Sequence, residues 1–177
     1  NLTLVFLDKI NFVKKLKGNL KITNKNVKFA QISASFNNSQ TISFSIKPTN
    51  NGEIITTLFS SKAKPLVDRY KFIKGFKDDK EGYLDFYSSK KDGVSTSKLV
   101  IDNFKVKEIP ALAKLLALAS LQGIADLLTG EGIRFTDFEM NFTNQDKLMK
   151  IQELYAIGPA ISILLEGYIE EDKLISL

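Results

Sequence analysis

Alternation of apolar and polar residues with a period of two runs through most of this 177-residue chain and favours folds built mainly from β-strands. Ile42, Phe44 and Ile46, for example, alternate with Thr and Ser. Because successive side chains of a strand point to opposite faces, each such segment has one apolar and one polar face. The alternating segments are residues 20–36, 42–48, 53–59, 82–88, 94–106, 133–142, 148–157 and 160–169. We therefore expect about eight to ten antiparallel strands.

Two of these segments change phase along their length. Val27 and Phe29 share one phase, whereas Ile32 and the residues after it follow the other. Ile101 and Phe104 are out of step in the same way. A slip by one residue is what a β-bulge produces. The predicted sheet is therefore curved and contains bulges.

One short segment has helical spacing instead. Residues 62–73 carry Leu66, Tyr70 and Ile73 at intervals of four and three, with Pro65 in the first turn. This pattern predicts a short amphipathic helix.

A block of Ala and Leu, PALAKLLALASLQGIADLLTGEG, occupies residues 110–132. Twenty helical residues reach about 30 Å, so a membrane-spanning helix has to be weighed. Lys114 and Asp126 lie within the block and Gly123 interrupts it, and a charge in mid-membrane costs on the order of 3 kcal/mol. We predict a helix pair near residues 111–129, which either packs on the sheet or also caps an apolar groove or dips into a membrane surface. The candidate cap or membrane-contact residues are Leu112, Leu115, Leu116, Leu121, Ile124 and Leu128.

Charge is divided unevenly along the chain. Residues 1–80 hold 15 Lys and Arg against 5 Asp and Glu, whereas residues 81–177 hold 10 against 15. A basic end can meet anionic lipid headgroups or nucleic acid, or can simply be a solvated surface. Only Arg69 and Arg134 are arginines, so the side chain that reads guanine is nearly missing. We expect no nucleic-acid partner.

Catalytic signatures are weak. The chain has no Cys and no His, which removes the thiolate nucleophile and the commonest general base. The pattern S-x-x-K at residues 61–64, 88–91 and 95–98 is what chance gives in a Lys-rich chain. Asp78 and Asp79 fit a charged turn better than a carboxylate pair. We expect neither an enzyme nor a cofactor or metal site.

The order of elements resembles a known family. A helix (PLVDRYKFIKGF) is followed by two strands (GYLDFYSS and SKLVIDNFKV), by the Ala/Leu block, and by strands joined through Gln145-Asp146 and Gly158-Pro159. This order, and above all residues 115–135, is similar to the C-terminal region of bacterial AsmA-like proteins of the YhdP/TamB superfamily. We interpret residues 1–177 as one AsmA-like C-terminal domain cut from a longer chain, with β meander or hairpins in residues 1–59 and the best match in residues 60–177.

The resemblance implies a Gram-negative protein that is anchored in the inner membrane and projects through the periplasm. It implies that a curved sheet carries phospholipid between the inner and outer membranes in an apolar groove, without a cofactor. Alternating apolar residues would line such a groove, although the same alternation builds an ordinary sandwich core. The candidate lining residues are Phe29, Phe44, Ile46, Leu84, Phe86, Leu99, Ile101, Phe138, Met140, Phe142, Ile163 and Leu165. The alternative is a structural module that docks on a membrane or a partner protein through the Ala/Leu helices.

Overall fold

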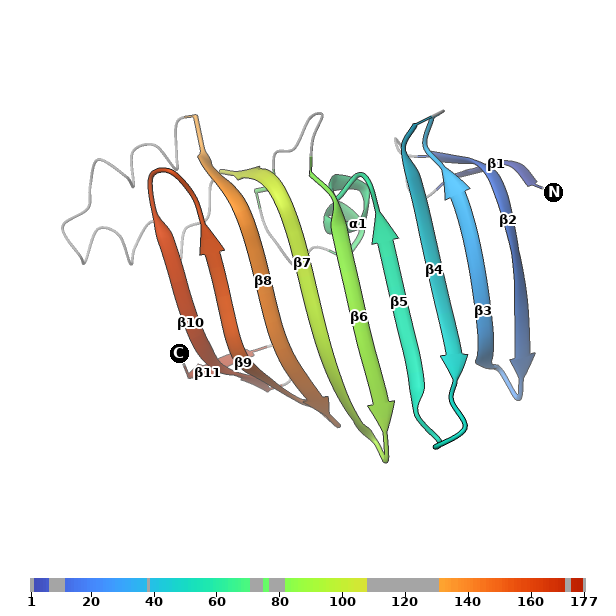
Figure 1. Cartoon of the computed structure of the whole chain (residues 1–177). Coiled ribbons are helices and arrows are strands. Elements are labelled where there is room, and N and C mark those ends of the chain that lie inside the picture. The colour runs from blue at the N-terminus through green and yellow to red at the C-terminus, as the bar shows by residue number, and fades with distance from the viewer. Residues whose placement is uncertain are drawn as a thin grey trace.

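A computed structural model gives the fold and describes residues 2–6, 12–37, 39–70, 75–76, 82–107, 131–170 and 173–176 (Figure 1). Within these residues, eleven strands form one sheet in which each strand pairs antiparallel with the next along the chain. The strands are β1 (Leu2–Phe6), β2 (Phe12–Thr23), β3 (Asn26–Ser35), β4 (Thr41–Pro48), β5 (Ile54–Ser60), β6 (Leu84–Lys91), β7 (Val94–Val106), β8 (Ile133–Gln145), β9 (Leu148–Ile157), β10 (Ser162–Glu170) and β11 (Lys173–Ser176). The prediction of a mainly β, antiparallel fold is confirmed.

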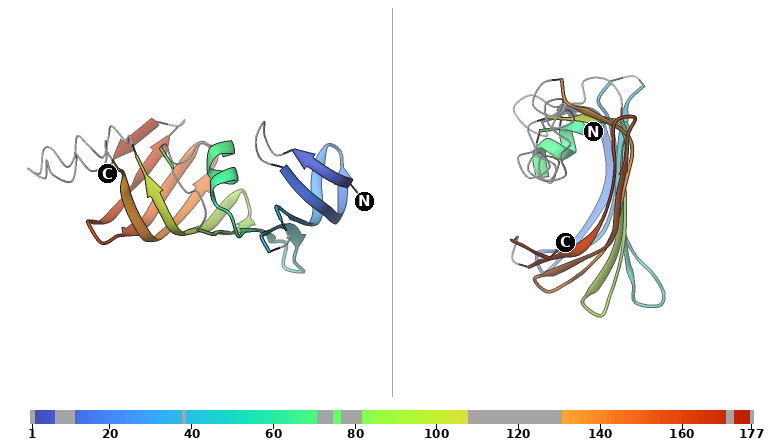
Figure 2. Two further views of the ribbon diagram at one scale, coloured as in Figure 1. Left: turned by 90° about the horizontal axis from the view of Figure 1, so that it is seen from above. Right: turned by 90° about the vertical axis from the view of Figure 1, so that its left-hand side faces the viewer.

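The sheet is open, with β1 at one edge and β11 at the other. These two strands fall outside the alternating segments given above. They are short, since β1 has 5 residues and β11 has 4. Figure 2 shows that the sheet is curved and that the helix α1 (Lys64–Tyr70) lies on its concave side. We call this side the inner face and the opposite side the outer face. Shifts of register in the β2–β3, β8–β9 and β9–β10 pairs add to the ordinary twist of the strands.

The helix α1 occupies the place where the sequence predicts a helix near residues 62–73. Leu66 and Val67 are buried, as the helical spacing requires, whereas Tyr70 is 69% exposed. Among the described residues, no helix combines the length and the apolar composition needed to cross a membrane. The helix pair predicted near residues 111–129, with all six of its candidate contact residues, lies outside the described residues.

The core lies between α1 and the inner face of β6, β7 and β8. Val67, Leu84 and Ile101 are at most 1% exposed. Burying each of these side chains contributes roughly 1.5–3 kcal/mol to folding. Because α1 places its apolar side against these strands, the short helix is held by packing rather than by its own propensity.

Stacked aromatic rings extend this core toward the end of β7. The ring of Phe76 stacks on Phe104 with centroids 5.3 Å apart, and Phe104 stacks on Phe135 at 5.5 Å. The backbone N–H of Lys107 donates to the carbonyl oxygen of Gly75 at 2.8 Å and ties the Phe76 segment to the sheet. Gly75 has φ +72, and an added Cβ would meet the Lys107 carbonyl oxygen, so this contact requires glycine.

The phase of alternation changes in β7 and β8 at the same level. Ile101 pairs with Phe138 and Phe104 pairs with Phe135, so each strand places two residues between successive buried positions. Asn103, one of the two residues between Ile101 and Phe104 on β7, has a positive φ of 47. Because both strands slip together, their pairing continues and all four buried side chains stay on the inner face. The slip predicted between Ile101 and Phe104 is confirmed.

Candidate functional site

One row of apolar side chains crosses the inner face without a polar interruption. Directly paired residues of neighbouring strands point to the same face, so the register identifies the members of the row. The central apolar row consists of Ile32, Phe44, Leu58, Phe86, Leu99, Met140, Leu154 and Leu165, one residue from each strand from β3 to β10. At about 4.8 Å per strand, the row is roughly 34 Å long.

Polar residues enter the rows on either side of the central apolar row. On the side of α1, the β5 position is Ser60, which is buried and donates to the Lys62 carbonyl oxygen at 2.7 Å. On the other side, Ser88 and Ser97 are buried and share a hydrogen bond of 2.9 Å. These hydroxyls therefore have partners inside the protein, which removes the cost of burying them.

The inner face becomes polar further toward the β6–β7 turn. Lys90, Ser95 and Asn144 stand side by side in the register of β6, β7 and β8. We call these three residues the polar rim. On the inner face of the middle strands, the apolar surface therefore ends at polar side chains.

A cavity of about 360 Å³ lies over the central apolar row, beside α1. Its volume falls within the range of small-molecule pockets, about 300–1,000 Å³. Leu66 and Tyr70 of α1 form one wall. The remaining lining residues come from six strands and are Phe44, Thr56, Leu58, Leu84, Phe86, Leu99, Met140, Phe142 and Met149. Apart from the hydroxyls of Thr56 and Tyr70, the lining side chains carry no polar group, so the cavity suits an apolar ligand.

The structure brings together half of the residues that the sequence analysis proposes for the groove. Those that line the cavity are Phe44, Leu84, Phe86, Leu99, Met140 and Phe142. Five others share the inner face without lining it, namely Ile46, Ile101, Phe138, Ile163 and Leu165. Ile101 and Phe138 belong to the buried core, where Phe138 meets the ring of Phe104 edge-on at 6.1 Å. Neither of these two side chains lines the cavity.

Phe29 lies on the outer face, and its placement in the groove lining is wrong. It alternates with Ala30, which pairs with Ile46 on the inner face. The sequence puts the change of phase after Phe29. In the structure the extra residue is Lys28, because Lys21 pairs with Phe29 while Ile22 pairs with Val27. A bulge one residue earlier thus turns Phe29 to the opposite face.

Several residues that line the cavity are not among those predicted from the sequence. Leu58 and Met149 come from segments recognised as strands, so the pairing of alternate positions could have found them. Leu66 and Tyr70 could not be found in that way, because nothing in the sequence places α1 against the central apolar row. These two side chains reach the cavity only because α1, which follows β5, lies against the inner face of the sheet.

On the outer face, Glu139 accepts three hydrogen bonds. Lys98 Nζ lies 2.7 Å from its Oε1, Asn141 Nδ2 donates to the same oxygen at 3.0 Å, and Tyr155 Oη donates to Oε2 at 2.8 Å. Burial alone raises the pKa of Glu139, but these hydrogen bonds, with Lys98 first, outweigh it and lower the pKa below 4.5. The hydrogen bond to Glu139, followed by burial, raises the pKa of the Tyr155 phenol above 10.0.

The free energy of unfolding should fall as the pH drops through the folded-state pKa of Glu139. Because the lowered pKa favours the charged form in the folded protein, the contribution is complete above pH 4.5 and is lost below it. Glu139→Gln should flatten this part of the profile and cost less than about 1 kcal/mol at neutral pH, since the ion pair is partly exposed. Urea unfolding from neutral pH to about pH 3 measures both. Lys98→Gln should flatten the same part of the profile. If the wild type, Glu139→Gln and Lys98→Gln lose stability in parallel as the pH falls, the loss does not come from Glu139.

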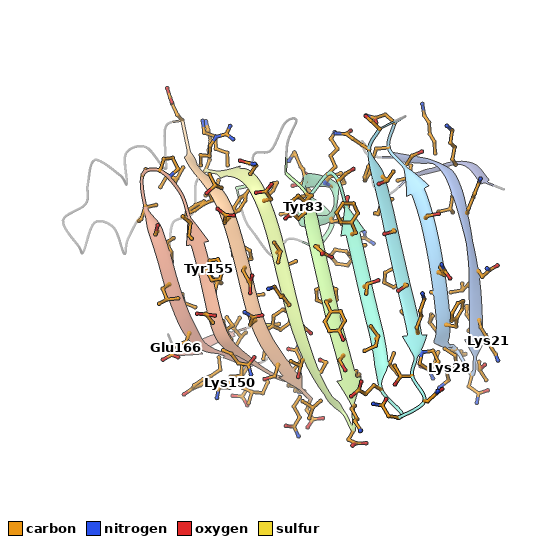
Figure 3. All side chains as sticks on the ribbon, in the orientation of Figure 1. Lys21, Lys28, Tyr83, Lys150, Tyr155 and Glu166 are labelled. Atoms are coloured by element: carbon orange, nitrogen blue, oxygen red, sulfur yellow. The ribbon has the colours of Figure 1, made fainter. Side chains whose placement is uncertain are left out.

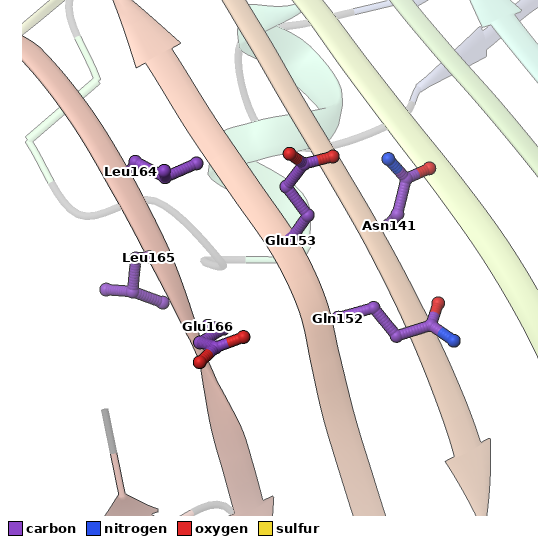
Figure 4. A pocket seen from close by; sticks show the side chains of 6 residues that line it. All are labelled: Asn141, Gln152, Glu153, Leu164, Leu165 and Glu166. Atoms are coloured by element: carbon purple, nitrogen blue, oxygen red, sulfur yellow. The ribbon is translucent and has the colours of Figure 1, made fainter.

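A second hollow opens across β8, β9 and β10 (Figure 4). It measures about 560 Å³ and is lined by Asn141, Gln152, Glu153, Leu164, Leu165 and Glu166. The register of β9 shifts at Gln152, between the pairs made by Ile151 and Glu153. Four of the six lining side chains are polar or charged, so this hollow is more polar than the cavity beside α1. The apolar cavity of the inner face is therefore the better candidate site.

Comparison of the chain with protein-family models, with curated proteins and with solved structures gives no match.

Proposed function

We propose that this chain holds phospholipid acyl chains on the inner face of its sheet. In this proposal it is an AsmA-like, non-enzymatic segment of a periplasmic protein anchored in the inner membrane. The whole protein moves phospholipid between the inner and outer membranes through an apolar β-groove and so supports outer-membrane integrity.

The continuity of the central apolar row is the observation that carries the proposal. Phe44, Leu58, Phe86, Leu99 and Met140 belong both to this row and to the lining of the cavity. An acyl chain is a long, flexible apolar rod, and a row that crosses eight strands offers it contact along its length. Each methylene group removed from water contributes about 0.8 kcal/mol, so a chain of ordinary length gains enough to bind.

The two ends of a phospholipid need different surroundings. The acyl chains suit the central apolar row, whereas the headgroup needs water or polar partners. The rim at Lys90, Ser95 and Asn144 provides polar groups beside that row, and Lys90 is exposed. A headgroup at this rim lies beside the central apolar row, which would hold the acyl chains.

Native mass spectrometry of the purified chain tests the proposal directly. We expect a fraction of the protein to carry phospholipid, and we expect the protein to take up a fluorescent short-chain phospholipid from solution. A protein that is free of lipid and leaves the fluorescent probe in solution would contradict the proposal. That result would favour the structural alternative, in which the Ala/Leu block docks the chain on a membrane or a partner protein.

A further inference from the structure

The hairpin formed by β2 and β3 ends in a tight turn. Asn24 and Lys25 form the turn with positive φ angles of 50 and 62, and the pair Thr23 and Asn26 closes it. Two positive φ angles are the mark of a type I′ turn, whose twist matches that of the paired strands. The side chain of Asn26 also donates to the Asn24 carbonyl oxygen at 3.2 Å. The end of this hairpin is therefore shaped in advance.

Three large apolar side chains are exposed next to this turn. Leu20 is 55% exposed, Ile22 is 58% exposed and Val27 is 41% exposed. All three lie on the inner face, because Leu20 pairs with Ala30 and Ile22 pairs with Val27. Such a cluster at the end of a hairpin is unfavourable in water and suggests a surface that becomes covered.

Positive charge lies at the same end of the hairpin as these apolar side chains, with Lys21 on the opposite face of the sheet. Residues 12–48 contain seven lysines and no Asp or Glu. Lys21, Lys25 and Lys28 are exposed at the hairpin end, and Figure 3 shows Lys21 and Lys28 there, at the opposite ends of the strands from α1. The hairpin end thus combines an apolar cluster with a basic one.

We propose that the end of the β2–β3 hairpin docks on the surface of an anionic lipid bilayer. Leu20, Ile22 and Val27 enter the boundary between headgroups and acyl chains, while the lysines reach the anionic headgroups. Nucleic acid is the weaker candidate, because it offers no site for three exposed aliphatic side chains. This proposal concerns residues outside the cavity and is independent of lipid transport.

Flotation with vesicles tests the docking. The protein should float with vesicles of equal parts phosphatidylglycerol and phosphatidylcholine, and binding should weaken with added salt. The triple variant Lys21→Gln, Lys25→Gln, Lys28→Gln should bind about a hundredfold more weakly, at about fivefold for each lysine. The control triple Lys62→Gln, Lys105→Gln, Lys107→Gln, at the other ends of the strands, should bind as wild type does. Circular dichroism would verify that both triples are folded.

A single apolar change separates docking from simple charge attraction. Ile22→Ser should reduce vesicle binding at least several-fold while leaving the charge unchanged. The Lys21, Lys25, Lys28 triple should still take up a soluble short-chain phospholipid at the wild-type level. Loss of vesicle binding with normal uptake therefore concerns the docking proposal and not the transport proposal.

Several outcomes would overturn the docking proposal. The proposal fails if the wild-type protein does not float with the vesicles. It also fails if the hairpin triple and the control triple lose vesicle binding equally. A protein that binds single-stranded nucleic acid but not vesicles, and loses this in the first triple, would identify a nucleic-acid surface instead. Self-association by light scattering that disappears in Ile22→Ser, with no vesicle binding, would identify a second copy of the chain as the occupant.

Discussion

Phe44→Glu is expected to abolish phospholipid uptake while the protein stays folded. Phe44 stands between Ile32 and Leu58 in the central apolar row and lines the cavity, yet it is only partly buried. A carboxylate can therefore stay hydrated in the empty protein. It would have to lose its water under an acyl chain, which costs several kcal/mol and lowers affinity by more than about 100-fold. Titration with a fluorescent phospholipid measures the loss.

Ser43→Glu is the matched control for this change. Ser43 precedes Phe44 on the same strand, is exposed and points to the outer face. The two variants have the same net charge, so only the face that carries the carboxylate differs. Ser43→Glu should take up lipid as wild type does, and both variants should have similar unfolding midpoints. Equal uptake by both variants would remove the inner face of β4 from the proposed lipid path.

Ile101→Ala should destabilise the folded protein strongly, with a loss of about 2–5 kcal/mol in the free energy of unfolding. Ile101 is 0% exposed and lies between its paired neighbours Leu84 and Phe138 on the inner face. Removing its side chain leaves a cavity that paired strands cannot close, because their spacing is fixed by backbone hydrogen bonds. Urea unfolding followed by circular dichroism gives the change in free energy.

Val100→Ala provides the comparison for Ile101. Val100 is the preceding residue of β7, faces outward between Asp85 and Glu139, and is only partly buried. Its truncation should cost less than about 1 kcal/mol. Losses of equal size would mean that the outer face is packed as tightly as the inner face, contrary to the assignment of the core.

Much of the fold follows from local sequence pattern. The alternation around Phe44, the turn after Pro48 and the slip before Phe104 are all present in the structure where the sequence predicts them. The short helix is present as well, at Lys64–Tyr70. These features depend on neighbouring residues, because the period of the pattern and the turn chemistry act over a few positions.

The candidate site is less predictable for the same reason. Phe29 has the pattern of an inner-face residue, and only the pairing of Lys21 with Phe29 shows that the bulge precedes it. Phe138 and Ile101 occupy the same kind of alternating apolar position as Phe86. The first two are buried in the core without lining the cavity, whereas Phe86 lines it. Alternation identifies a face of the sheet, whereas burial depends on what covers that face.

Local pattern alone is enough to specify an antiparallel β protein with a short helix, because hydrophobic period and turn residues act between near neighbours in the chain. It does not specify which strands are adjacent, which phase each strand has after a bulge, or where α1 crosses the sheet. Those features exist only in the folded protein, because they depend on pairing between strands and on packing across the inner face. Pairing joins Phe44 and Met140, which are far apart in the sequence, in one apolar row.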